Sequence, residues 1–187
     1  MAPRKNTHCL MGAILAADQD ATREFIHAIG DIEGKWSFVI QSLLKEVEVS
    51  DEARARFHSM WTELGGRIRR QVANDKALAQ MLSALLPKYS GEKIRLYRGE
   101  SSERYAAGRI GFCWTPRVDK AETFGRGLNA YYDGGGILLA INADPSSIIA
   151  GPNEHSRYLD EHEHTVDPFS ISDIEILKKY KRLYADR

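Results

Sequence analysis

A chain of 187 residues can bury a hydrophobic core without disulfides or metals, and it has the size of one ordinary domain or one domain with a helical extension. Hydrophobic residues make up 43% and charged residues 28%, which is typical of a globular protein and excludes wholesale disorder. The 26 Lys and Arg residues balance the 26 Asp and Glu residues. This zero net charge disfavours proteins that coat nucleic acid or anionic membranes, because those are usually basic overall.

Cysteine content and hydropathy address the compartment. Cys9 and Cys113 are too few for a disulfide framework and are expected to be free thiols in a reducing cytosol. No window of about 18 apolar residues exists, so no membrane span is expected. The mainly apolar run at 9–18 resembles the core of a signal peptide, but it is short and acidic residues close it. We therefore predict a buried N-terminal helix and a cytoplasmic protein.

The first 90 residues are predicted to be helical, because apolar side chains recur there every three to four positions. The first such helix covers 20–29 and ends at Gly30. A second apolar stripe with helical spacing runs over 36–47.

Two further helices follow before the pattern changes. Ser50 precedes two acidic residues and is expected to cap the third helix. The pair Gly65-Gly66 lies in the middle of this helix and predicts a kink or a break. Asn74 is expected to cap the fourth helix, and Pro87 to end it.

After Gly91 the sequence becomes richer in glycine and in short apolar runs. Strands are predicted over 93–98, 111–115, 136–142, 147–150, 161–166 and 171–177, with a short helix around 117–124. Helices followed by strands predict an α+β protein rather than an alternating parallel α/β fold. The predicted organisation is a helical N-terminal region over 1–90 and a β-rich core over 91–187, packed as one compact unit.

A dense group of metal-type ligands lies late in the chain. It consists of His155, Glu161, His162, Glu163 and His164. On a strand, the last two histidines would share one face and the two glutamates the other. Because zinc needs at least three converging ligands, this group leaves a His/Glu metal-dependent hydrolase as an alternative. A solvated loop and strand edge explains the histidines more simply, and we predict no metal site.

The pair Glu161 and Glu163 has a second interpretation. On an extended segment the two carboxylates would point to the same side, where two close negative charges are costly unless a cation or polar substrate lies between them. A solvent-exposed edge strand is the structural alternative, because glutamate is common on such edges.

Four short segments occur in a recognisable order. They are Leu96-Tyr97-Arg98-Gly99, Gly111-Phe112-Cys113-Trp114-Thr115, Ala121-Glu122-Thr123-Phe124 and Glu161-His162-Glu163. Together they resemble the mono-ADP-ribosyltransferase family of the R-S-E type, which includes cholera-like and clostridial-like toxins and many small phage and bacterial effectors. The resemblance covers 93–177. It implies a split antiparallel β core of the ADP-ribosyltransferase type behind the helical N-terminal region.

The resemblance also implies NAD+ as the substrate, and roles for named residues. The residues expected to bind NAD+ are Arg98, Gly99, Cys113, Thr115 and Glu163. Arg98 would clamp the diphosphate, because a guanidinium forks onto phosphate oxygens. Glu163 would stabilise the positive charge that develops on the ribose and would hold the 2′-hydroxyl. Cys113 stands where the family has its first serine, and Thr115 keeps a hydroxyl that is expected to orient Glu163.

The acceptor of ADP-ribose is less constrained by the sequence. In the family, an E-x-E pair goes with guanidinium acceptors, so Glu161 is expected to activate the acceptor and Tyr158 to contact it. The basic and aromatic segment 178–184 instead has the composition of a contact to single-stranded nucleic acid. The E-x-E pair leads us to predict a protein acceptor. The resemblance also implies a toxin or anti-phage role and an antitoxin or chaperone partner. ADP-ribosylation of RNA and a catalytically dead NAD-fold binding module remain alternatives.

Overall fold

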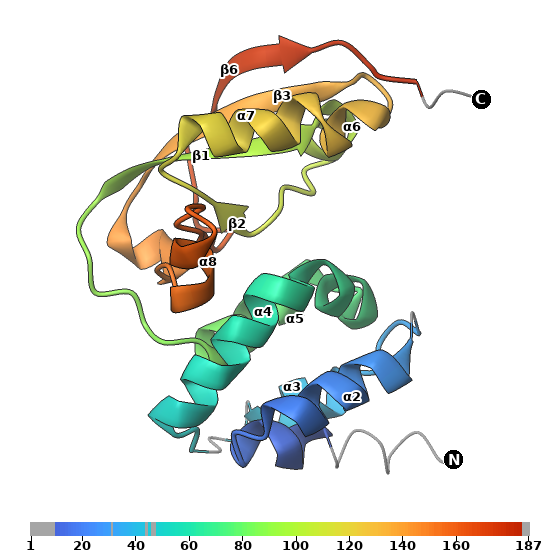
Figure 1. The fold of residues 1–187 in the computed structure, drawn as a ribbon, viewed down its shortest axis with the longest axis vertical. Coiled ribbons are helices and arrows are strands. Elements are labelled where there is room, and N and C mark those ends of the chain that lie inside the picture. The colour runs from blue at the N-terminus through green and yellow to red at the C-terminus, as the bar shows by residue number, and fades with distance from the viewer. Residues whose placement is uncertain (1–9, 31, 44, 46–47, 185–187) are drawn as a thin grey trace. The chain divides into compact units, whose positions relative to one another are not determined.

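The computed structural model describes residues 10–30, 32–43, 45 and 48–184 (Figure 1). The chain divides between Lys88 and Tyr89 into two compact units. The first unit is helical in its described part, and the second combines two small antiparallel sheets with short helices. This mixed composition, with helices first and strands later, confirms the predicted α+β class.

The N-terminal unit follows the predicted pattern of helices. Residues 10–15 are helical, and Leu10 and Ile14 are buried, as predicted, while Cys9 lies outside the described residues. The helices that follow are α2 (Gln19–Ile29), α3 (Ser37–Leu43), α4 (Asp51–Val72) and α5 (Asp75–Leu85). The part of the second stripe at 44, 46 and 47 also lies outside the described residues.

Helix caps explain where these helices begin. The Ser50 side chain accepts a hydrogen bond of 3.2 Å from the N–H of Ala53, and the Asn74 side chain accepts one of 3.0 Å from Ala77. Both predicted caps are confirmed. The predicted break at Gly65 is wrong, because α4 runs on through it without interruption. A side chain at Gly65 would lie 3.3 Å from the Trp61 ring, so the glycine makes room for that indole.

The second unit contains two three-stranded antiparallel sheets. Their orders are β1-β3-β6 and β2-β5-β4. The strands are β1 (Ile94–Ser101), β2 (Cys113–Trp114), β3 (Gly136–Ala143), β4 (Ile148–Ala150), β5 (His164–Val166) and β6 (Glu175–Tyr180). An isolated bridge between Tyr97 and Thr115 links the two sheets. Leu96, Trp114 and Leu139 are among the buried residues that form the core between them.

Short helices complete this unit. They are α6 (Ser102–Ala106), α7 (Val118–Arg126) and α8 (Glu154–Tyr158), with single 3₁₀ turns η1 (Leu128–Tyr131) and η2 (Pro145–Ser147). Helix α7 lies across the β1–β3 sheet (Figure 1). A side chain at Gly99 would come within 2.3 Å of the Ala121 carbonyl, and one at Gly136 within 1.8 Å of the Gly125 carbonyl. Glycines therefore allow the backbone of α7 to approach both strands closely.

The strand predictions differ in accuracy. Those over 93–98 and 136–142 are confirmed and extend by a few residues, whereas the one over 171–177 overlaps β6 only from Glu175. The strand predicted over 161–166 is wrong before His164. There, His162 adopts a positive φ of 47°, which an extended strand does not allow. No helix of the described part of the chain combines the length and apolar character needed to cross a bilayer.

Candidate functional site

Arg98 lies in β1, and its side chain is mostly buried, with 15% of its surface exposed. Its Nε donates a hydrogen bond of 2.9 Å to Glu100 Oε2, and its Nη1 donates one of 2.6 Å to the Cys113 carbonyl. The backbone of Gly111 lies against the guanidinium, because a Cβ there would be 2.0 Å from Nη2. The cation is thus held by β1 itself and by the segment that leads into β2.

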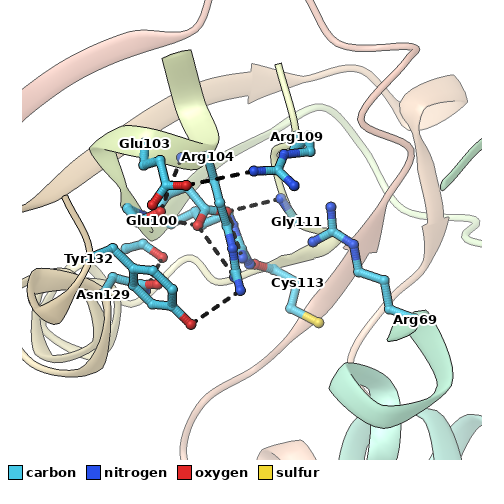
Figure 2. A network of polar contacts seen from close by, with 12 residues as sticks. Arg69, Glu100, Glu103, Arg104, Arg109, Gly111, Cys113, Asn129 and Tyr132 are labelled. Atoms are coloured by element: carbon cyan, nitrogen blue, oxygen red, sulfur yellow. Dashed lines mark hydrogen bonds and ion pairs between the residues drawn. The ribbon is translucent and has the colours of Figure 1, made fainter. Parts of the chain in front are cut away.

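Glu100 is the fully buried carboxylate beneath this arginine. It accepts hydrogen bonds of 2.9 Å from the N–H of Ser101 and 3.0 Å from the N–H of Gly111 (Figure 2). Arg104 lies further out, with its Nη1 3.9 Å from Glu100 Oε1. Burial opposes ionisation of Glu100, but the charge of Arg98 and the N–H donors outweigh it and hold the pKa below its ordinary value.

Glu163 lies in a loop and precedes β5. As a residue it keeps partial solvent contact, yet protein surrounds its carboxylate, and this burial is the main cause that raises its pKa to about 7. A hydrogen bond with Cys113 lowers the pKa, the negative charge of Glu161 raises it, and the positive charge of Arg98 lowers it. These four predicted site residues therefore act on one another, although they come from three separate segments.

Thr115 has a different partner from the expected one. Its hydroxyl donates a hydrogen bond to the backbone carbonyl of Glu161 and accepts one of 3.0 Å from the N–H of Arg117. The expected contact from Thr115 to the Glu163 carboxylate is replaced by the contact from Cys113. Thr115 thus fixes the backbone of the loop, while the Cys113 thiol interacts with the Glu163 carboxylate.

The loop that carries both glutamates is conformationally constrained. Asp160 and His162 adopt positive φ angles of 56° and 47°. The Ser156 carbonyl accepts hydrogen bonds of 2.9 Å from the N–H of Glu161 and 3.1 Å from the N–H of His162. The Arg117 guanidinium also forms an ion pair with Asp160. Such strained residues persist only where the surrounding contacts determine them, and they are frequent at functional sites.

Tyr158 ends α8, just before this loop, and its side chain is 87% exposed. Helix α8 lies between the strands predicted over 147–150 and 161–166, where no helix was predicted. Its N-terminus is capped by the Asn153 side chain, which accepts a hydrogen bond of 2.8 Å from the N–H of Ser156. Asn153 before Glu154 is a capping signal that could have predicted this helix. The acceptor contact proposed for Tyr158 stays a prediction.

The histidine and glutamate group does not form a metal site in the described part of the chain. No three His, Cys, Asp or Glu side chains there converge well enough to hold an ion. His164 is buried with its ring centroid 5.8 Å from that of Tyr89, and its Nδ1 lies 2.9 Å from the His162 carbonyl. Burial lowers the pKa of His164. These contacts are structural and give the hydrolase alternative no support.

The basic segment 178–184 has local acidic partners. Lys178 Nζ lies 2.8 Å from Glu122 Oε1, and Arg182 Nη1 lies 2.5 Å from Asp133 Oδ1. Each of these cations also lies over a tyrosine ring of the same segment. Because these charges are partly neutralised, the segment is a weaker contact for nucleic acid than its composition indicates.

Two contacts at the site were not predicted from the sequence. Glu100 was missed because the strand was expected to end at Arg98. A strand extended by two residues would have placed Arg98 and Glu100 on the same face. The pairing of Arg117 with Asp160 joins residues 43 positions apart and left no local signal. Comparison of the chain with models of protein families, with curated proteins and with solved structures finds no match.

Proposed function

We propose that this protein is a mono-ADP-ribosyltransferase that cleaves NAD+ and transfers ADP-ribose to a macromolecular acceptor, acting as a cytoplasmic toxin or anti-phage effector. The observation that carries the proposal is that Cys113, Glu161 and Arg98 all act on the Glu163 carboxylate, while Arg98 also donates a hydrogen bond to the Cys113 carbonyl. Each was singled out in the sequence by its place in the R-S-E pattern. Two small antiparallel sheets joined at Tyr97 are compatible with the split β core of that family.

The residues fit the chemical demands of the reaction. The nicotinamide leaving group is cationic and needs no acid, so the protein must supply a carboxylate near the developing charge and a cation for the diphosphate. Glu163 would supply the first. Arg98 would supply the second through the N–H donors that Glu100 and Cys113 do not use, because a guanidinium carries five. The positive charge of Arg98 also acts on Glu163 and lowers the pKa of its carboxylate.

The direct test is the release of nicotinamide from NAD+ by the purified chain. Release that exceeds the rate of the Glu163→Gln variant at least tenfold is expected. A binding module with dead chemistry would retain NAD+ binding without release. A metal-dependent hydrolase would lose its activity with a chelator, whereas nicotinamide release is expected to be unchanged by one.

The rate of nicotinamide release should depend on pH through Glu163. The carboxylate must be ionised to stabilise positive charge, and its pKa is about 7. We therefore expect kcat/KM for NAD+ to rise about tenfold per pH unit below 7 and to level off above it. In Cys113→Ser the midpoint should move to lower pH, because a hydroxyl is a stronger donor to the carboxylate than a thiol. A profile that is flat between pH 5.5 and 8 would contradict this role of Glu163.

Glu161 should matter more for transfer than for hydrolysis. It lies close enough to Glu163 to raise its pKa, and an acceptor nucleophile entering the site needs a base that water attack on the activated ribose does not. Glu161→Gln is expected to lower transfer to the acceptor about tenfold or more relative to hydrolysis of NAD+. Equal losses in the two reactions, measured with labelled NAD+, would show that Glu161 does not activate the acceptor.

A protein acceptor, with arginine as the side chain, is favoured over RNA. The E-x-E pair supports this choice, and so do the local acidic partners of Lys178 and Arg182. Labelled product from a bacterial lysate should be destroyed by protease and should resist ribonuclease. Product with the opposite sensitivity, falling steeply with salt, would identify RNA as the acceptor.

A further inference from the structure

Glu100 is unusual among the carboxylates of this protein. It is fully buried, whereas the acidic partners of Arg117 and Arg182 are mostly exposed and that of Lys178 is partly exposed. Backbone N–H groups on two different segments, at Ser101 and Gly111, bind its two oxygens separately. The carboxylate therefore has no freedom to rotate or to follow a moving partner.

This fixed carboxylate binds one side of the Arg98 guanidinium. Nε and Nη2 both lie 2.9 Å from Glu100 Oε2. Nη1 is held at the other end by the Cys113 carbonyl, at 2.6 Å. The backbone of Gly111 lies directly against the group, where any side chain would overlap Nη2. Contacts at all three nitrogens thus determine the position and the plane of the cation.

The Cys113 contact connects this arrangement to Glu163. The residue whose carbonyl holds Arg98 is the same residue whose thiol binds the Glu163 carboxylate. Arg98, Cys113 and Glu163 are therefore connected in one chain of hydrogen bonds that begins at Glu100. A change at Glu100 would displace the guanidinium relative to Glu163 without touching Glu163 itself.

We propose that Glu100 is a positioning residue, which fixes the guanidinium of Arg98 so that its remaining N–H donors face a diphosphate bound beside Glu163. This inference rests on the proposed function. In this proposal Glu100 controls the affinity for the diphosphate and does not control the step that breaks the bond to nicotinamide. Arg104 lies too far from Glu100, at 3.9 Å, to replace Arg98 in this contact.

Substitution by glutamine tests the proposal. Glu100→Gln keeps the volume of the side chain and removes its charge. Its single carbonyl oxygen can accept from only one of the two backbone N–H groups, and its NH2 group is a donor that cannot bind the guanidinium. We expect the Kd for ADP-ribose and the KM for NAD+ to rise about tenfold or more, with kcat within threefold. Glu100→Asp, which keeps the charge, should recover part of the affinity. Glu103→Gln is the matched control. It removes a nearby charge whose ion pair, within the described part of the chain, is with Arg109 at 3.9 Å, and it should leave both constants unchanged.

Coupling to Arg98 separates positioning from general damage to the fold. In an Arg98→Lys background, adding Glu100→Gln should change the Kd for ADP-ribose less than twofold, because the geometry of the fork is already lost. An unchanged KM in folded Glu100→Gln, or losses that multiply independently, would overturn the proposal. If Glu100→Gln does not fold, Glu100→Asp decides the question through the same two measurements.

A direct observation of Arg98 keeps this proposal separate from the proposed function. The Nε–H of Arg98 should give a slowly exchanging proton resonance that disappears in Arg98→Lys and exchanges rapidly in Glu100→Gln. Rapid exchange in the wild-type protein would overturn the positioning role. Failure of the wild-type protein to bind NAD+ or ADP-ribose would instead overturn the proposed function, while the resonance would still report whether Glu100 fixes the guanidinium.

Discussion

Glu163→Gln should lower nicotinamide release at saturating NAD+ at least about a hundredfold, which corresponds to about 2.7 kcal/mol of barrier. The substitution preserves the size of the side chain and removes the negative charge that would stabilise the transition state. Glu161→Gln is the matched control for charge, because it neutralises the neighbouring carboxylate. Its rate of NAD+ hydrolysis should stay much closer to wild type. Activity of Glu163→Gln within fivefold of wild type would exclude Glu163 as the catalytic carboxylate.

The same variant should be more stable than wild type at high pH. The folded-state pKa of about 7 lies above the ordinary value of 4.5, so ionisation of Glu163 costs the folded protein more than the unfolded one. Wild-type stability therefore falls as the pH rises from about 4.5 to about 7 and levels off above that, whereas below about 4.5 the effect is absent. In urea titrations, the free energy of unfolding of Glu163→Gln should exceed that of wild type by about 2–3 kcal/mol at pH 8 and should equal it at pH 4. A gain in stability with a loss of turnover would show that the rate falls for chemical reasons.

The sequence predicted the helical part of the molecule well, because its signals are local. Ser50 and Asn74 act within four residues, and the spacing of apolar side chains follows directly from the helix period. The error at Gly65 concerns the predicted break, because the Trp61 ring, one turn earlier in the same helix, occupies the space beside this glycine and the helix continues. Helix propensity is weak beside such packing.

The strands and the site were predicted less completely. Alternation marked β1, and a short apolar run marked β3, which is buried along nearly its whole length. It could not reveal that His162 leaves the extended region, since that depends on hydrogen bonds from the loop to Ser156 and Thr115. The argument that two glutamates at i and i+2 share a face of a strand was therefore wrong in its geometry. The two carboxylates nevertheless lie close enough to interact, because the loop folds back at Asp160.

The pattern of motifs predicted which residues meet, but not how they are held. Arg98, Cys113 and Glu163 were identified because their segments resemble the R-S-E motifs in their order. Of their supports, Glu100 would have followed from a longer predicted strand, whereas the pair formed by Arg117 and Asp160 depends on a contact between distant segments. The exchange of roles between Cys113 and Thr115 has the same origin, because only the fold decides which of two side chains on one strand faces the carboxylate.

Removal of the Arg98 side chain should give the largest loss of stability in this site. Arg98→Ala leaves Glu100 charged and fully buried, and breaking a buried pair in this way costs roughly 3–5 kcal/mol. Arg104 Nη1, at 3.9 Å, offsets part of this cost and favours the lower end of the range. Arg98→Lys keeps a cation and should lose far less.

The pH dependence and a double variant identify the cause of that loss. In wild type, Arg98 holds the pKa of Glu100 below its ordinary value, so the pair stabilises the fold above about pH 4.5 and this contribution disappears as the pH falls. In Arg98→Ala, only the two backbone N–H donors and the more distant Arg104 oppose the effect of burial on Glu100, so its pKa should rise. The free-energy difference from wild type should then be largest at pH 7–8 and should shrink towards pH 4. Arg98→Ala/Glu100→Gln, which buries no charge, should regain more than half of the lost stability at pH 7 while still failing to bind ADP-ribose. Urea titrations at pH 4 and 7.5 measure all three variants. Two results would contradict this explanation: a loss of stability in Arg98→Ala that does not change with pH, or a larger loss when Glu100→Gln is added. Either would mean that Arg98 is needed for the fold for a reason other than the buried charge of Glu100.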